Sequence, residues 1–141
     1  MEKTGTMSYN LNPIEELQCV FLSYETEMEA AEIEFARREV LKQLGTKRWS
    51  RVVVDVTQYK SIPTAWELFG LSRSLSLDLP RNVRIALVIR PDQARHARLV
   101  ESVARNGGIV LACFADAGYA TAWVNGESYP DNCTRDDFIL C

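Results

Sequence analysis

Short apolar runs separated by polar turns follow one another along the chain. Four of them are rich in β-branched or aromatic residues, which favours buried strands, and they lie at 18–24, 51–56, 83–89 and 109–114. A weaker alternation over residues 8–12 ends at Asn12-Pro13 and predicts an edge strand, antiparallel to the strand at 18–24. The run at 51–56 is apolar on both faces, which is typical of a central strand with helices on either side.

The stretches between these strands carry apolar residues at helical spacing. Thr26 and Glu29 have the spacing of a capping box, and we expect Gly45 to end the helix that starts there in a left-handed conformation. Asp92 and Asp116 are expected to cap two later helices, because a short polar side chain can accept the first backbone N–H groups. The predicted helices cover 26–44, 64–79, 92–106 and 116–124.

The order of these elements is β-β-α-β-α-β-α-β-α, and the helices are long enough to connect parallel strands. We therefore expect an α/β fold, with one mixed, mostly parallel sheet covered by about four helices. A single domain is expected at 8–125, between a short tail at 1–7 and a polar tail at 126–141. A chain of 141 residues can bury one core without help from a metal or a disulfide.

Charge and hydropathy exclude two classes of partner. The formal net charge is −3, whereas a general nucleic-acid binder needs a dominant basic surface, so no nucleic acid is expected. No run approaches the ~20 apolar residues of a membrane span, and the first residues lack the apolar stretch of a signal peptide. We expect a cytoplasmic protein that does not insert into membranes.

The residues that most often carry chemistry are sparse. The four cysteines form no CxxC pair, so neither a zinc site nor a redox motif is indicated, and no metal or other cofactor is expected. Cys19 and Cys113 lie in apolar runs and are expected in the core. His96 is the single histidine, and its neighbours are arginines rather than a carboxylate or a nucleophile, which favours a surface position. We therefore predict that the protein is not an enzyme.

A candidate site follows the central strand. Asp55 ends the apolar run, and Ser61 and Thr64 lie in the loop that enters the next helix. Ligands of open α/β sheets bind beyond the carboxyl ends of the strands, which is where this loop is expected. A phosphate on either hydroxyl would meet a favourable helix dipole, so Ser61 and Thr64 are candidate phospho-acceptors in a switch loop. The alternative is structural: the hydroxyls cap the helix and Asp55 bonds to backbone N–H groups.

Large aromatic residues and arginines give two further candidates. Trp66, Phe69 and Trp123 are expected to line an apolar pocket between helices and sheet, or else to be ordinary core residues. Several arginines of the second half could gather into an anion-binding face or remain solvated: Arg73, Arg81, Arg84, Arg90, Arg95, Arg98 and Arg105.

The strand, loop and helix of 52–67, the strand at 83–89 and the segment 103–124 together resemble the SpoIIAA-like proteins, bacterial domains of the STAS/SEC14-like group. The resemblance covers about residues 8–125, and its most specific part is the pattern Phe-x-Asp-x-x-x-Ala-x-x-Trp, which ends at Trp123. STAS proteins of the anti-sigma-factor antagonist type carry an Asp-Ser-Ser-Gly-like motif after the central strand, where a phosphorylated serine switches binding to a kinase-like partner. Here that place reads Ile-Pro-Thr-Ala-Trp, and Thr64 is the hydroxyl nearest to the acceptor.

The resemblance implies a function in binding. Its leading implication is a non-enzymatic regulatory or scaffold domain that binds a protein partner. The alternative, implied by the SEC14-like relatives, is a protein that binds a small apolar ligand or a lipid. Self-association into a homodimer through an apolar helix face is a further expectation.

Overall fold

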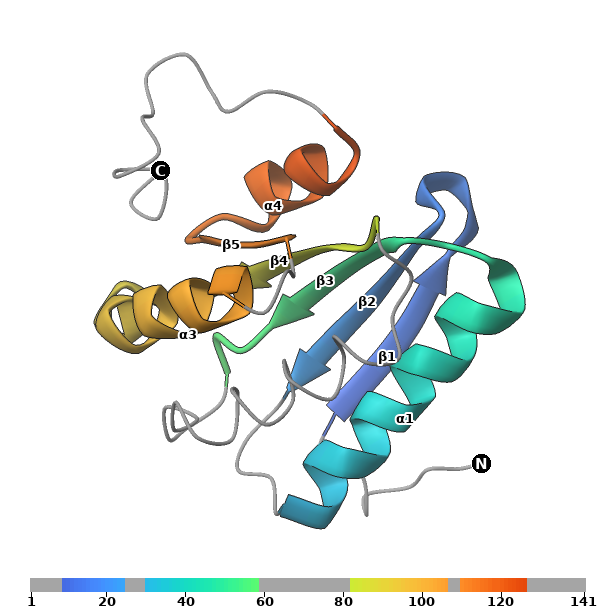
Figure 1. Cartoon of the computed structure of the whole chain (residues 1–141), viewed down its shortest axis with the longest axis horizontal. Helices are drawn as coiled ribbons and strands as arrows, with labels where there is room; N and C mark the ends of the chain where they lie inside the picture. The colour runs from blue at the N-terminus through green and yellow to red at the C-terminus, as the bar shows by residue number, and fades with distance from the viewer. Residues whose placement is uncertain (1–8, 25–29, 59–81, 107–109, 127–141) are drawn as a thin grey trace.

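A computed structural model describes residues 9–24, 30–58, 82–106 and 110–126 of the chain (Figure 1). These residues form one five-stranded sheet and three α-helices. The strands are β1 (Tyr9–Ile14), β2 (Cys19–Tyr24), β3 (Arg51–Asp55), β4 (Arg84–Val88) and β5 (Val110–Phe114). The helices are α1 (Ala30–Lys47), α3 (Ala94–Asn106) and α4 (Ala117–Val124), and two 3₁₀ turns cover Glu15–Leu17 and Pro91–Gln93. The helix predicted at 64–79 and the Thr26 capping box lie outside the described residues.

The strands lie in the sheet in the order in which they occur in the chain, β1-β2-β3-β4-β5. β1 and β2 are antiparallel, and every other neighbouring pair is parallel, which confirms the predicted mixed, mostly parallel sheet. From β2 to β5, each parallel crossover places the new strand next to the previous one, always in the same direction along the sheet. Because crossovers of this kind are almost always right-handed, their connecting helices are expected on one face of the sheet.

The side chains at the end of β5 show which helix covers which face. Cys113 and Phe114 are consecutive strand residues and therefore point to opposite faces. The Cys113 thiol lies 3.5 Å from the carbonyl oxygen of Ala97 in α3, whereas the Phe114 ring lies 5.6 Å from the Trp123 ring of α4. α3 and α4 thus cover opposite faces, and Figure 1 shows α1 beside β1 on the side away from α4.

The core fills both sides of the central strands. Val52, Val53 and Val54 of β3 are all buried, as the doubly apolar run predicted. α1 contributes Ala36, Val40 and Leu44, and α4 contributes Ala120, Trp123 and Val124. In the part of the chain that the structure describes, no helix combines the length and apolar character needed to cross a bilayer.

Two predicted boundaries near the start of the chain are wrong. The first is the break at Asn12-Pro13, because β1 continues through Pro13 to Ile14. β1 pairs with β2 alone, and a proline without an N–H group is tolerated on such an edge strand.

The second boundary is the end of α1. Gly45 stays within the helix, and the left-handed residue is Arg48, with a φ of 59°. The backbone N–H of Trp49 donates to the carbonyl of Leu44 across 3.1 Å, and both side chains are buried. This six-to-one bond with an apolar contact is a Schellman ending, in which Arg48 holds the place usually taken by glycine. The burial of Trp49 therefore decides where the helix stops.

The start of α4 is as predicted. The Asp116 carboxylate accepts the backbone N–H of Tyr119 across 3.0 Å and caps the helix. Gly118 lies so close that a Cβ atom there would be 2.9 Å from the carboxylate. A side chain at position 118 would therefore crowd the capping carboxylate of Asp116 at the turn between β5 and α4.

Candidate functional site

The carboxyl ends of β3, β4 and β5 meet at one edge of the sheet, because these strands are parallel. Asp55 lies there at the end of β3, as predicted. The candidate phospho-acceptors Ser61 and Thr64 lie outside the described residues, so their role stays a prediction. What the structure describes at this edge is a set of polar side chains that hold the chain leaving β3 against the start of α3. We call this set the carboxyl-edge network, and its members are Asp55, Thr57, Arg90, Asp92 and Gln93.

The Asp55 carboxylate turns back onto its own loop. Its Oδ1 accepts the backbone N–H of Thr57 across 2.8 Å and the Thr57 hydroxyl across 2.6 Å. A carboxylate that bonds the backbone two residues ahead forms an Asx turn, which fixes the direction in which the chain leaves the strand. These contacts agree with the structural alternative for Asp55, in which its carboxylate bonds to backbone N–H groups.

Arg90, two residues beyond the end of β4, extends the network. Its Nη1 donates to the carbonyl oxygen of Thr57 across 2.6 Å, and its Nε donates to Asp92 Oδ1 across 3.0 Å. The hydrogen bond from Arg90 and its charge hold the pKa of the Asp92 carboxyl below its usual value. Asp92 was predicted as a helix cap, and this is wrong: the carboxylate turns to Arg90, and the residue that enters the turn at Pro91–Gln93 is Arg90 itself.

Gln93 is the centre of the network and was missed by the sequence prediction. Its side chain is 2% exposed, yet both of its polar atoms are bonded. Nε2 donates to the Val56 carbonyl across 3.1 Å, and Oε1 accepts the Arg90 backbone N–H across 2.8 Å. The available signal was Pro91 followed two residues later by a glutamine, which has the spacing of the N1 and N3 positions of a capping box.

The observed contacts of the carboxyl-edge network are hydrogen bonds and an ion pair that hold the chain in place. Its carboxylates and amide bond to neighbouring groups of the same network or to the backbone. Within the described residues, no three histidine, cysteine, aspartate or glutamate side chains gather in a way that could hold a metal ion. The two described cysteines, Cys19 and Cys113, are buried. Burial raises the pKa of the Cys19 thiol to about 11, which keeps it in its protonated, weakly nucleophilic form at neutral pH.

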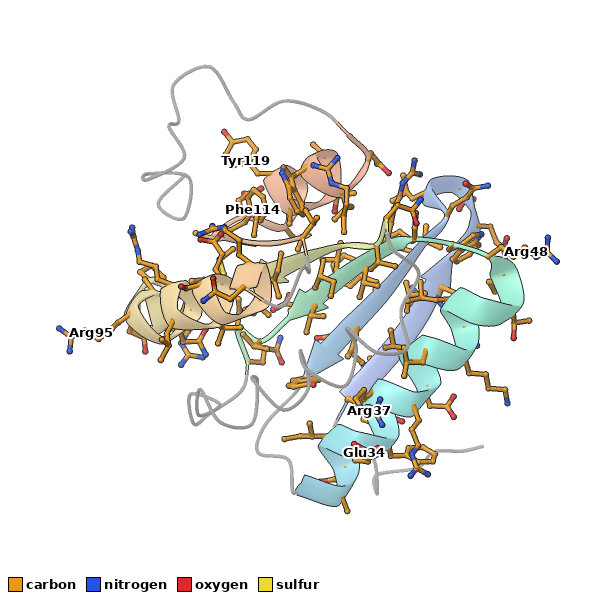
Figure 2. The ribbon with its side chains drawn as sticks, in the orientation of Figure 1. Glu34, Arg37, Arg48, Arg95, Phe114 and Tyr119 are labelled. Atoms are coloured by element: carbon orange, nitrogen blue, oxygen red, sulfur yellow. The ribbon has the colours of Figure 1, made fainter. Side chains whose placement is uncertain are left out.

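The predicted apolar pocket is described only at one of its residues. Trp123 is buried, with its ring 5.6 Å from that of Phe114 and 4.3 Å from the guanidinium carbon of Arg84. Trp66 and Phe69 lie outside the described residues, so the pocket stays a prediction. Figure 2 shows Phe114 between the sheet and α4, where Trp123 packs on it.

The predicted arginine face is divided by the structure. Arg84 and Arg90 are engaged at opposite ends of β4, and Arg73 and Arg81 lie outside the described residues. The other three arginines lie along the exposed side of α3, and Figure 2 shows Arg95 pointing away from the molecule. Leu99, in their midst, is 50% exposed. We call this surface the outer face of α3, and it comprises Arg95, Arg98, Leu99, Ser102 and Arg105.

No protein-family model matches the chain, and a comparison with curated proteins found no match. The resemblance to SpoIIAA-like proteins therefore stays a prediction from the residue pattern that ends at Trp123 and from the order of the elements.

Proposed function

We propose that the chain is a non-enzymatic regulatory or scaffold domain of SpoIIAA-like, STAS-like type, and that it binds a protein partner through the outer face of α3. The observation that carries this proposal is the exposure of Leu99 between arginines. A half-exposed leucine on a helix whose Ala97, Val100 and Ala104 side chains are buried offers an apolar contact without a role in the core.

The inner and outer faces of α3 differ in a way that supports a binding role. Ala97, Val100 and Ala104 are 1–3% exposed and pack toward the sheet. On the other side, Arg95 and Arg98 flank Leu99 and are exposed. Arginine and a central apolar residue are frequent in protein interfaces, and acidic residues on a partner would complement this charge. The partner is thus expected to present an apolar contact with an acidic rim.

The carboxyl-edge network supplies a reason for the outer face to respond to a signal. Gln93 and Arg90, at the start of α3, bond directly to the chain that leaves β3. That chain leads to Ser61 and Thr64. A phosphate on either residue would add nearly two negative charges within seven residues of Thr57 in the sequence, and Thr57 belongs to the set of hydrogen bonds that hold the start of α3. In this proposal, phosphorylation changes partner affinity through the network.

Affinity capture with surface variants of α3 and of α1 tests the proposal. Purified wild-type protein, Arg95→Glu, Leu99→Ser and Lys42→Glu would each be incubated with extract of the source cell, and the bound proteins quantified by mass spectrometry. Lys42 is an exposed base on α1 and provides the matched charge reversal away from α3. We expect a partner that wild type and Lys42→Glu retain and that both α3 variants lose by about tenfold or more. Equal retention by all four proteins, or no specific partner for any, would refute the proposal.

A further inference from the structure

Two arginines lie side by side at the opposite, amino edge of the sheet. Arg51 of β3 and Arg84 of β4 are direct register partners, so their side chains leave the same face of the sheet. It is the face that α4 covers, because Arg84 contacts Trp123. Neighbouring strands are ~4.8 Å apart, so the two cationic side chains start from adjacent positions on this face. Such a pair is unfavourable unless something of opposite charge lies nearby.

The described contacts of these arginines include no carboxylate. Arg51 Nη1 donates to the carbonyl oxygen of Leu17 across 2.9 Å. The guanidinium of Arg84 lies over the ring of Trp123, at 4.3 Å from its centre. In the described part of the chain neither arginine takes part in an ion pair, and Glu15, in the turn before Leu17, is paired with Lys47 at 2.8 Å.

Arg84 Nε is a buried donor without an acceptor among the described residues. Leaving a charged donor unsatisfied is costly, so an acceptor that reached it would gain more than at a solvated arginine. Trp123 adds to this effect, since a guanidinium stacked on an aromatic ring has its plane fixed and presents its N–H groups at the edge.

The neighbouring thiol does not supply the missing charge. Cys19 on β2 is the register partner of Arg51. Cys19, Arg51 and Arg84 therefore lie in one row across three neighbouring strands. The charge of Arg51 favours a thiolate, but burial dominates and raises the pKa of Cys19 to about 11. The thiol is therefore neutral at physiological pH.

Apart from the buried Cys19, the residues of the row are partly exposed. Arg51 and Arg84 are each partly exposed, and Val110, the register partner of Arg84 on β5, is 47% exposed. We propose that Arg51 and Arg84 form a binding site for a small oxyanion, a phosphate or carboxylate group, at the amino edge of β3 and β4. The two guanidinium groups match such oxygens in charge and in planar geometry, and Trp123 holds Arg84 in place. This site is independent of the carboxyl-edge network and of the outer face of α3.

Titration of ¹⁵N-labelled protein with inorganic phosphate tests the site, with the arginine Nε–H resonances observed by NMR at constant ionic strength. We expect a saturable shift of the Arg84 resonance. A parallel titration with acetate distinguishes the two sources of the oxyanion: a tighter response to phosphate assigns a phosphate ligand, and a tighter response to acetate assigns a carboxylate. If neither anion shifts the Arg84 resonance in a saturable way, the proposal is wrong.

Variants separate the site from general electrostatics. Arg84→Lys and Arg51→Lys keep the charge and lose the planar fork, so each is expected to weaken anion binding by about tenfold, read from the Arg51 resonance in Arg84→Lys and from the Arg84 resonance in Arg51→Lys. Arg48→Lys is the control, because Arg48 is exposed at the end of α1 and points outward (Figure 2). Equal anion affinity in all three variants would overturn the proposal. The wild-type titration needs no variant and stands even if a substitution impairs folding.

Discussion

The side chain of Gln93 and the backbone of Val56 are joined by a hydrogen bond of 3.1 Å, although 37 residues separate them in sequence. The bond is buried and connects the exit of β3 with the entry to α3. Because Gln93 also accepts the Arg90 N–H, one side chain satisfies two backbone groups at the carboxyl edge. The chain that leaves β3 at Val56 is therefore held by Gln93, which lies between β4 and α3.

Replacing Gln93 should destabilise the protein far more than replacing an exposed glutamine nearby. Gln93→Ala leaves the Val56 carbonyl and the Arg90 N–H without their partners, which should lower the free energy of unfolding by about 2–3 kcal/mol. Gln58→Ala is the control, because Gln58 is exposed at the same edge, and its effect should stay within about 0.5 kcal/mol. Urea denaturation measures both values. Similar values for the two variants would show that the buried bonds contribute little.

Asp55 should act through its acceptor oxygen. Asp55→Ala removes the acceptor of both Thr57 groups and should cost about 1–2 kcal/mol. Asp55→Asn retains a carbonyl oxygen at this place and should recover at least half of that loss. Thermal unfolding of the two variants checks the order. A larger loss for Asp55→Asn than for Asp55→Ala would contradict the role of Asp55 as a turn-forming acceptor.

Arg48 offers a stabilising substitution. Its φ of 59° lies in the left-handed region, where a residue with a Cβ atom is strained and glycine is not. Arg48→Gly should therefore raise the free energy of unfolding by up to about 1 kcal/mol. Arg48→Ala keeps the Cβ atom and removes the same side chain, so it separates relief of strain from loss of charge. If Arg48→Ala stabilises as much as Arg48→Gly, backbone strain is not the cause.

Cys19 should make stability decrease at alkaline pH. Its pKa is about 11 in the folded protein, raised by burial, against about 8.5 for an unperturbed thiol. Between these values the unfolded chain releases the thiol proton and the folded chain keeps it, so stability falls as pH rises through this window. The contribution is complete below the lower value.

Comparison with Cys19→Ala isolates this effect from the titration of other groups. The stability difference between wild type and Cys19→Ala should shrink from about pH 8.5 to about pH 11, by at most ~1.4 kcal/mol per pH unit. Urea denaturation at several pH values measures this difference. A difference that stays constant over the whole window would mean that the Cys19 thiol titrates normally in the folded protein.

Features that depend on residues close together in the sequence were predictable from it. The strand runs and the helical spacing gave the α/β class and the mixed sheet, because burial imposes a period on side chains that lie close together in the chain. The Asp116 cap was predictable for the same reason, since its partner Tyr119 is three residues away. The continuation of the predicted edge strand through Pro13 was not, because it depends on which backbone groups of β1 pair with β2.

The sites depend on contacts between distant segments, and this is why the sequence did not reveal them. Gln93 reads as an ordinary helix-entry residue until β3 and β4 are placed side by side. The pairing of Arg51 with Arg84 requires the strand register, which no local pattern specifies. Of the predicted site residues, Asp55 and Trp123 have described contacts, whereas Ser61, Thr64, Trp66 and Phe69 stay predictions.

The sequential strand order has a consequence for how the protein folds during synthesis. Each new strand joins the one made just before it, so the sheet can grow in step with the emerging chain and few contacts must wait for distant partners. α4 is the exception, since it packs back on β3 and β4 as well as on β5. Until the ribosome has released the chain through Val124, the face beneath α4, with Phe114, stays uncovered. This interval is when the nascent chain is most open to aggregation or to a chaperone.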